Sequence, residues 1–335
     1  MSSEGGRFTV VFNGEIYNHR ELRRQLESEG ARFRGTSDTE VMLAAFVRWG
    51  VAAALPRLWG MFALAVWDEA ARTLTLARDR IGKKPLYYGR LSGAWLFGSE
   101  LKALRAHSGF DAPIDREALT AFFRFGYVPG PRSIYRGVCK LSPGTYMALT
   151  ADGAGQPKPY WSAEDLPQVP TAVFQNDRAA ADALESLLMD AVGRRMVADV
   201  PLGAFLSGGL DSSLVVALMQ RLSGRPVKTF TIGFDVEGFD EAQAARAVAA
   251  HIGPDHTELY VTPRQALDVI PRLPAIYDEP FSDSSQIPTL LISQLARSQV
   301  TVALSGDGGD ELFGGYTRYV WATQLWAAAR LLPLW

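Results

Sequence analysis

The sequence is poor in the residues that build disulfide frameworks and metal cages. Its 335 residues include 1 cysteine and 4 histidines, which excludes an intrachain disulfide framework and a multi-cysteine zinc site. No apolar run approaches the roughly 20 residues that span a bilayer. The start, MSSEGGRFTVVF, has neither the basic flank nor the apolar core of a signal peptide. We therefore expect a cytoplasmic protein with no membrane attachment.

An excess of charge of either sign is also lacking. The formal net charge is −2 and no basic stripe stands out, which argues against nucleic acid as a partner. Neither GxxxxGK[ST] nor GxGxxG occurs, so the chain has no P-loop or dinucleotide fingerprint. What remains is an ordinary globular composition, 47% hydrophobic, in a chain long enough for two domains.

The pattern of the chain changes near residue 160. Residues 1–160 hold short β-like runs such as FTVVF, MFALAVW and TYMALT, interrupted by the helical stretches HRELRRQLESEG and SDTEVMLAAFVRWG. They predict an α+β domain with a largely antiparallel sheet. Residues 161–177 fall in a stretch rich in Pro, Gly and polar residues, which is typical of a linker. Over residues 178–335, buried-looking strands alternate with helices, which predicts a parallel α/β sheet.

The first strand-to-helix turn of the second half reads LSGGLDSS, residues 206–213. Ligands of open parallel sheets bind at the carboxyl ends of strands, and glycine amides opening a helix attract anions. Asp211 repels phosphate unless a divalent cation lies between them. The alternative is a plain glycine turn in which Asp211 or Ser212 caps the helix.

A second glycine-rich turn, VALSGDGGDELFGGY over residues 302–316, crowds acidic side chains after another buried strand. Such carboxylates repel each other unless cations or ligands lie among them. A flexible acidic loop fits poorly between two apolar flanks. The two turns together predict one site for a nucleotide and a metal.

These motifs resemble a known family. SGGLDSS is similar to the pyrophosphate loop of the ATP pyrophosphatases. With SGDGGDELFGGY and DEPFSDSSQIPT it resembles the synthetase domain of glutamine-dependent asparagine synthetases. FNGEIYNHRELRRQL, SDTEV, RDRIGKKPLYY and FGSELKAL resemble that family's N-terminal-nucleophile glutaminase domain. The resemblance implies a layered αββα glutaminase domain, followed by a parallel-sheet domain of the adenine-nucleotide α-hydrolase type.

For the synthetase domain, the resemblance implies adenylation of the aspartate side-chain carboxylate by ATP, with Mg2+, after which ammonia displaces AMP. The matching positions divide into three groups. The ATP site would be Leu206, Ser207, Gly208, Gly209, Asp211, Ser212, Ile232, Ser305 and Gly306; the metal would be held by Asp211 and Asp310; Asp307 would lie near the intermediate. Asp278, Asp283 and Ser284 are left open between substrate contact and turn chemistry.

For the glutaminase domain, the resemblance implies an oxyanion hole at Asn13 and Gly14, with Glu15 and Asp38 at the α-amino end of glutamine. Each motif has a simpler interpretation. Asn-Gly between apolar runs is a hairpin signal. SDTE resembles a capping box, in which an acid near the helix start is favourable anyway.

The sequence departs from the family pattern at both ends. Met1 is followed by Ser2, where the family carries its nucleophilic cysteine after the initiator methionine. Cys139 matches no catalytic position, and its expected role is that of a small buried hydrophobe. The family pattern also continues beyond WATQLWAAARLLPLW. We therefore expect an inert glutaminase half in a chain truncated at both ends.

Three classes of function remain open at this point. The first is an asparagine synthetase that uses glutamine as amido donor, a carbon–nitrogen ligase of amino-acid biosynthesis. The second is a relative such as a β-lactam synthetase, which forms an amide within one molecule. The third is a non-catalytic fragment. ATP, aspartate, and glutamine or ammonia are the expected small-molecule partners, and a homodimer is a candidate assembly.

Overall fold

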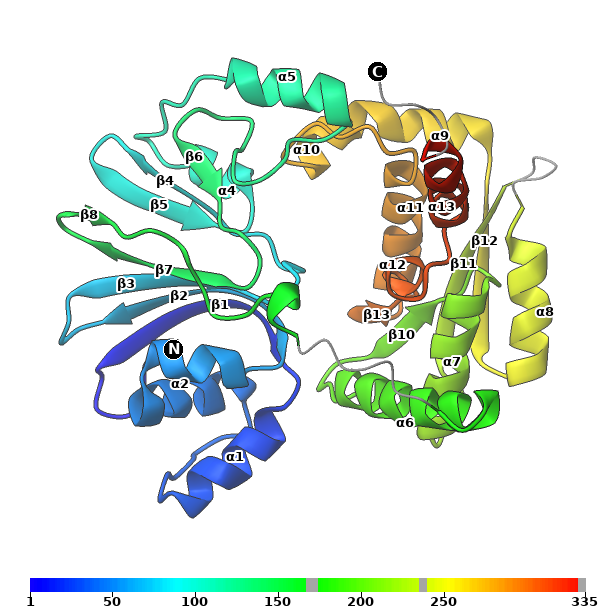
Figure 1. Cartoon of the computed structure of the whole chain (residues 1–335), viewed down its shortest axis with the longest axis horizontal. Coiled ribbons are helices and arrows are strands. Elements are labelled where there is room, and N and C mark those ends of the chain that lie inside the picture. Colours follow the sequence, from blue (N-terminus) through cyan, green and yellow to red (C-terminus); the bar gives the residue numbers. More distant parts are fainter. Residues whose placement is uncertain (167–173, 235–239, 331–335) are drawn as a thin grey trace. The chain divides into compact units, whose positions relative to one another are not determined.

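The computed structural model describes residues 1–166, 174–234 and 240–330. The chain forms two compact units (Figure 1). Unit 1 comprises Met1–Val173 and Arg272–Asp283, and unit 2 comprises Phe174–Pro271 and Ser284–Trp335. Residues 167–173, in the expected linker, and residues 331–335, at the end of the expected second domain, lie outside the described residues.

The helices and strands of unit 1 come mainly from the first half of the chain. They are β1 (Phe8–Ile16), α1 (His19–Ser28), α2 (Asp38–Trp49), α3 (Val51–Ala54), β2 (Gly60–Asp68), β3 (Thr73–Arg78), β4 (Tyr87–Leu91), β5 (Ala94–Gly98), α4 (Leu101–Arg105), α5 (Arg116–Phe125), β6 (Val138–Lys140), β7 (Thr145–Thr150), β8 (Gly153–Ala154), β9 (Lys158–Pro159) and α10 (Leu273–Ile276), with 3-10 turns at Leu55–Arg57 and Ala163–Asp165 and a third, Ile270–Arg272, at the junction with unit 2.

Two antiparallel sheets lie at the centre of unit 1, and three buried clusters show its layers. The larger sheet has the order β1-β2-β3-β7-β8, with β9 also paired to β7, and the smaller has the order β5-β4-β6. One cluster joins α1 and α2 to the larger sheet, through Leu26, Phe46 and Phe62 among others. A second fills the space between the sheets, and a third joins the smaller sheet to α4 and α5. The predicted αββα layering is confirmed.

Unit 2 alternates strands and helices. Its elements are α6 (Asp177–Arg195), β10 (Leu202–Phe205), α7 (Leu210–Leu222), β11 (Lys228–Phe234), α8 (Ala242–Ile252), β12 (Asp255–Val261), α9 (Pro263–Val269), α11 (Gln286–Arg297), β13 (Val302–Leu304), α12 (Gly309–Phe313) and α13 (Thr317–Ala329).

The sheet of unit 2 has the order β12-β11-β10-β13, and all of its pairings are parallel. Helices α6, α7 and α8 pack on one face around Val216, Met219 and Ala245. Helix α11 contributes Ala296 to a smaller cluster around Phe230. The predicted parallel α/β sheet is confirmed, and β10 and β13, whose ends carry the two glycine-rich turns, are neighbours.

One segment differs from the sequence-based division. Arg272–Asp283 belongs to unit 1, although the residues on both sides of it in the chain belong to unit 2. From the sequence, the whole of residues 178–335 is expected in the second domain. The reason for the difference is a set of polar contacts from Asp278 and Glu279 to backbone amides of unit 1. These contacts join residues far apart in the chain, so the local sequence pattern does not predict them.

Among the described residues, no single helix has the length and apolar character needed to cross a bilayer. Asp38–Trp49 and Val51–Arg57 together satisfy the length and composition test only as a pair bent by 120°.

Candidate functional sites

The turn LSGGLDSS lies at the carboxyl end of β10, as predicted, and leads into α7. Leu206 is buried and its amide donates to the carbonyl of Phe230 in the neighbouring strand β11. Gly208 has φ +79°, and a Cβ added there would lie 2.6 Å from the carbonyl carbon of Ala244 in α8. Only glycine fits this position, because the backbone is left-handed and α8 leaves no room for a side chain. The turn is therefore held in one shape.

Hydroxyl groups fix the inside of this turn. The hydroxyl oxygens of Ser207 and Ser212 lie 2.9 Å apart, and Ser212 Oγ also accepts from the amide of Ser207 at 3.2 Å. The amide of Gly209 donates to Ser207 Oγ at 3.3 Å. The cap of α7 is Gly209, with no side-chain hydrogen bond, so neither Asp211 nor Ser212 is the N-cap residue. Asp211 stands in the first turn of the helix, where a carboxylate also suits the helix dipole.

The second glycine-rich turn contacts the first. A Cβ added at Gly306 would lie 2.7 Å from the amide nitrogen of Ser212, and one at Gly309 would lie 2.3 Å from Asp211 Oδ2. The predicted convergence of the two turns at neighbouring strand ends is confirmed. A side chain at Gly306 would collide with the backbone of the first turn, whereas one at Gly309 would displace the Asp211 carboxylate.

The other expected residues of the ATP site are distributed around these turns. Ser305 follows β13, and its hydroxyl donates to Asp307 Oδ2 at 3.0 Å. Asp307 is exposed. Asp310 lies in the first turn of α12, with its carboxylate against the backbone of Gly315. Ile232 is buried in β11, which pairs with β10, the strand that Leu206 follows.

The expected residues of the glutamine site lie on or beside β1. Asn13 and Gly14 are inside the strand, paired with Ala63 and Phe62 of β2, so the hairpin interpretation of Asn-Gly is wrong. A Cβ at Gly14 would lie 2.0 Å from the carbonyl oxygen of Met61, which explains the glycine by close strand pairing. Asn13 is exposed, and its Nδ2 donates to Ser99 Oγ at 2.9 Å.

Asp38 is tied to the same strand. Its Oδ2 accepts from the amide of Ile16 at 2.9 Å. Ser37 is the cap of α2, whereas Glu40 accepts from Arg34 and Gly35 rather than from the cap residue, so SDTE is not a closed capping box. The structure thus brings Asp38 next to Glu15.

The electrostatics of β1 support an acidic, partly enclosed site. Partial burial, and then the neighbouring Asp38 carboxylate, raise the pKa of Glu15, whereas Lys84 opposes the shift. Two neighbouring carboxylates repel each other, and one lysine lies nearby. A bound ammonium group would reduce this repulsion.

Sequence reasoning missed several polar residues of unit 1. Lys84 and Ser99 both lie in motifs that resemble the family, but nothing local assigns either to β1. Asp79, in RDRIGKKP, is fully buried and its carboxylate accepts four backbone amides, from Phe62, Ile81, Lys83 and Lys84. The available signal for this role was a single acidic residue in a basic stretch. A lone carboxylate among cations is suited to binding and fixing the backbone around it.

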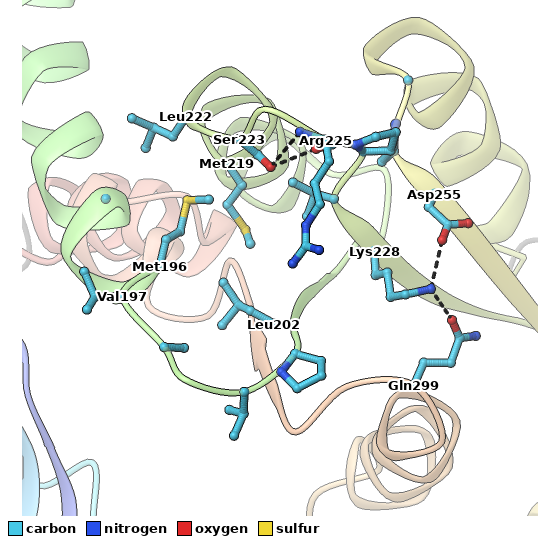
Figure 2. Close-up of a pocket in the computed structure, with 18 residues that line it drawn as sticks. Met196, Val197, Leu202, Met219, Leu222, Ser223, Arg225, Lys228, Asp255 and Gln299 are labelled. Carbon is cyan, nitrogen blue, oxygen red and sulfur yellow. Dashed lines mark hydrogen bonds and ion pairs between the residues drawn. The ribbon is translucent and has the colours of Figure 1, made fainter. Parts of the chain in front are cut away.

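A cavity of about 1060 Å³ lies elsewhere in unit 2 (Figure 2). It is lined by residues that include Leu202, Lys228 and Asp255, which begin β10, β11 and β12. It is therefore at the opposite end of the strands from LSGGLDSS. Lys228 Nζ is held there by Asp255 Oδ2 and Gln299 Oε1, each at 2.9 Å. None of the expected ATP-site residues lines it.

Two family models match the chain. The model described as glutamine amidotransferase domain matches residues 1–161, and the model described as asparagine synthase matches residues 183–334.

Curated relatives match along nearly the whole chain. Asparagine synthetase [glutamine-hydrolyzing] 1 of Bacillus subtilis is 38% identical over 95% of this chain and 49% of its own. A putative glutamine-hydrolysing asparagine synthetase of Mycobacterium tuberculosis is 41% identical over 93% of this chain and 48% of its own. A second putative asparagine synthetase, of Methanocaldococcus jannaschii, is 37% identical over 93% of this chain and 59% of its own. The chain thus spans about half the length of the curated relatives it matches.

Among solved structures, a glutamine phosphoribosylpyrophosphate amidotransferase from B. subtilis matches 80% of this chain and 51% of its own, with 17% identity and a TM-score of 0.35. The alternative of a β-lactam synthetase, which forms an amide within one molecule, is not better supported by these relatives. Residues 1–161 are thus similar to the glutamine amidotransferase domain, and residues 183–334 are similar to asparagine synthase.

Proposed function

We propose that this chain takes part in ATP-dependent asparagine synthesis: the side-chain carboxylate of aspartate is adenylated, and ammonia derived from glutamine then replaces AMP. The observation that carries the proposal is the contact of the two glycine-rich turns at Asp211. They form one polar site at the carboxyl ends of β10 and β13, where ligands of parallel sheets bind.

In this proposal, the α7 turn receives the phosphates of ATP. Amides and hydroxyls lie at the start of this 13-residue helix, which is a favourable place for an anion. They belong to Ser207, Gly208, Gly209 and Ser212. Leu206, Ile232, Ser305 and Gly306 complete the nucleotide site. These donors favour the charge that develops on the departing pyrophosphate. Adenylation is needed because a carboxylate oxygen is a poor leaving group and AMP is a good one.

The residues present fit a magnesium ion. Among the residues that the structure describes, no cluster of three or more His, Cys, Asp or Glu is suited to a metal. However, Mg2+ is commonly held by one or two carboxylates together with substrate phosphates. Asp211 and Asp310 supply two such carboxylates, each close against glycine backbone. A bound ion would screen the repulsion between these acids and ATP. Asp307, exposed beside Ser305, would lie nearest the aspartyl intermediate.

Unit 1 would bind glutamine. Glu15 and Asp38 would pair with its α-ammonium group, which accounts for two acids held side by side. The Asn13 amide and the Gly14 N–H would donate to the oxygen of the side-chain carbonyl as negative charge develops there. Cys139 is not assigned a role, because it lies in β6, paired with Tyr88 of β4, and burial raises the pKa of its thiol.

The setting of this reaction is part of the proposal. The partners are small molecules, namely ATP, aspartate, and glutamine or ammonia, and the compartment is the cytoplasm. No nucleic acid or membrane is involved. A homodimer is the candidate assembly, to be tested by light scattering.

The decisive experiment is Asp211→Asn, because asparagine keeps the size of the side chain and removes its charge. We expect the affinity for ATP in the presence of Mg2+, measured by calorimetry, to fall at least about tenfold, or about 1.4 kcal/mol. ATP–pyrophosphate exchange with aspartate should fall in parallel. Circular dichroism should be unchanged.

The matched control is Asp255→Asn, which removes an exposed acid at the other end of the same sheet. It should leave ATP affinity unchanged. Equal affinities in wild type and Asp211→Asn would remove the metal role of Asp211 and contradict the ATP-site model.

A further inference from the structure

Asp278 and Glu279 are two adjacent acidic residues whose carboxylates bind polar groups of unit 1. Glu279 accepts from the amide of Ile134 at 2.7 Å and pairs with Lys140 Nζ at 2.5 Å, and its side chain is 11% exposed. Asp278 accepts from the amides of Leu101 and Lys102 at 2.7 and 3.3 Å. Such nearly buried carboxylates require partners, so this dipeptide is firmly seated.

The Asp278 contacts complete helix α4. The first amides of a helix have no partner inside it. The cap residue of α4, Glu100, makes no side-chain cap hydrogen bond. Asp278 takes that role from a position 177 residues away in the chain. Helix α4 is only five residues long, and Leu101 is fully buried, so its start is defined largely by this distant carboxylate.

Two residues before Leu101 lies Ser99, which holds Asn13. The Asn13 Nδ2 donates one of its two hydrogens to Ser99 Oγ. A carboxamide is planar and rotates easily about its terminal torsion. One hydrogen bond to Ser99 therefore fixes the plane of the group and with it the direction of the second hydrogen.

We propose that Ser99 and Asp278 are positioning residues for the Asn13 amide: Ser99 orients the second N–H, and Asp278 fixes the turn that carries Ser99. The catalytic significance rests on the proposed function, in which that second N–H stabilises the oxyanion. The ligand concerned is the developing negative oxygen on the side-chain carbonyl of glutamine. Asp278 thus acts through Ser99 without touching glutamine.

The test is nuclear magnetic resonance of the Asn13 side-chain amide in the full chain. Its pair of signals is assigned by its disappearance in Asn13→Asp. In the wild type, we expect one proton to exchange with water several-fold more slowly than the other, since one is bound to Ser99 and the other is not. Ser99→Ala should abolish that difference. Asp278→Ala should reduce it and should also raise amide exchange at Leu101 about fivefold or more, which is the loss of a hydrogen bond worth about 1 kcal/mol.

Two variants control for general damage. Asp278→Asn keeps an acceptor oxygen for Leu101 and should restore most of the difference. Asp115→Ala removes the cap of α5, which accepts from Glu117 and Ala118 in the same unit, and should leave the Asn13 signals unchanged. Should Asp278→Ala fail to fold, Asp278→Ser takes its place, because a hydroxyl is a weaker acceptor than a carboxylate. Unchanged Asn13 signals in Ser99→Ala, or faster exchange at Leu101 with unchanged Asn13 signals in an Asp278 variant, would overturn the proposal.

A titration with L-glutamine separates this proposal from the proposed function. Wild-type signals of Glu15 and Asp38 that do not move with glutamine would contradict the glutamine site, while the Asn13 measurement would still test the positioning. Normal glutamine binding with unchanged Asn13 signals in every variant would contradict the positioning alone.

Discussion

Gly309 lies directly against the carboxylate of Asp211. A Cβ added at Gly309 would stand 2.3 Å from Oδ2 and 2.4 Å from Cγ. No real Cβ tolerates such contacts with a carboxylate, so a side chain at residue 309 and the present position of Asp211 exclude each other. The present position of the Asp211 carboxylate therefore depends on the absence of a side chain at residue 309.

Gly309→Ala should displace the Asp211 carboxylate and lower the affinity for ATP with Mg2+ by about tenfold. Affinity is measured by calorimetry and folding by circular dichroism. Gly224→Ala is the matched control, because a Cβ there would meet nothing within 4 Å. Unchanged affinity in Gly309→Ala would mean that the position of Asp211 does not matter for nucleotide.

Asp79→Asn should destabilise unit 1 by about 3 kcal/mol. Each carboxylate oxygen accepts two backbone amides, and the NH2 group of asparagine would face two of these donors with another donor. The change in the free energy of unfolding is measured in urea, and hydrogen exchange is followed at the backbone amides of residues 62–84. The exposed Glu69→Gln serves as control and should cost less than about 1 kcal/mol. Equal losses in the two variants would contradict the anchoring role of Asp79.

Glu15→Gln should change how stability depends on pH. Burial, followed by Asp38, raises the folded-state pKa of Glu15 above its ordinary value. The folded state therefore holds this proton more tightly, and the contribution of Glu15 to stability is lost as pH rises through the raised pKa. Above that window the variant should be more stable than wild type by no more than about 0.5 kcal/mol, since the side chain is partly exposed.

A pH series of urea unfolding tests this difference, which should vanish in acid. Glu40→Gln provides a control of opposite sign. The amide of Arg34, with smaller contributions from Gly35 and nearby arginines, lowers the pKa of Glu40, so its stabilisation is present at neutral pH and lost as pH falls through the lowered pKa. The same direction of change in both variants would contradict the assignment for Glu15.

Cys139 should behave as a slow, neutral thiol. Burial raises its pKa, which keeps the reactive thiolate scarce. Its reaction with a disulfide reagent near neutral pH should be several-fold slower in the native protein than in urea, because burial shields the thiol and keeps the thiolate scarce. Ammonia release from glutamine that is abolished by Cys139→Ala would instead identify Cys139 as a nucleophile.

The sequence predicted the elements whose signals are local. FTVVF predicted the start of β1, and LSGGLDSS the turn between β10 and α7, because alternation and glycine-rich turns are written in consecutive residues. The alternative of a hairpin at Asn13 and Gly14 is wrong because these residues lie inside β1, where Gly14 packs closely against the backbone of Met61. The Ser99 contact with Asn13 spans 86 residues, and the Asp278 contact with Leu101 spans 177. Such contacts arise only when the tertiary structure is complete.

The interrupted course of unit 1 along the chain also has a consequence for biosynthesis. During synthesis on the ribosome, residues 1–173 emerge long before Arg272–Asp283. Until then, the amides of Ile134 and Leu101 and the ammonium of Lys140 lack the carboxylates that pair with them in the finished protein. Most domains fold in order from the N-terminus as they appear. Here the first unit to be translated must wait for part of the second half before it can reach its final structure.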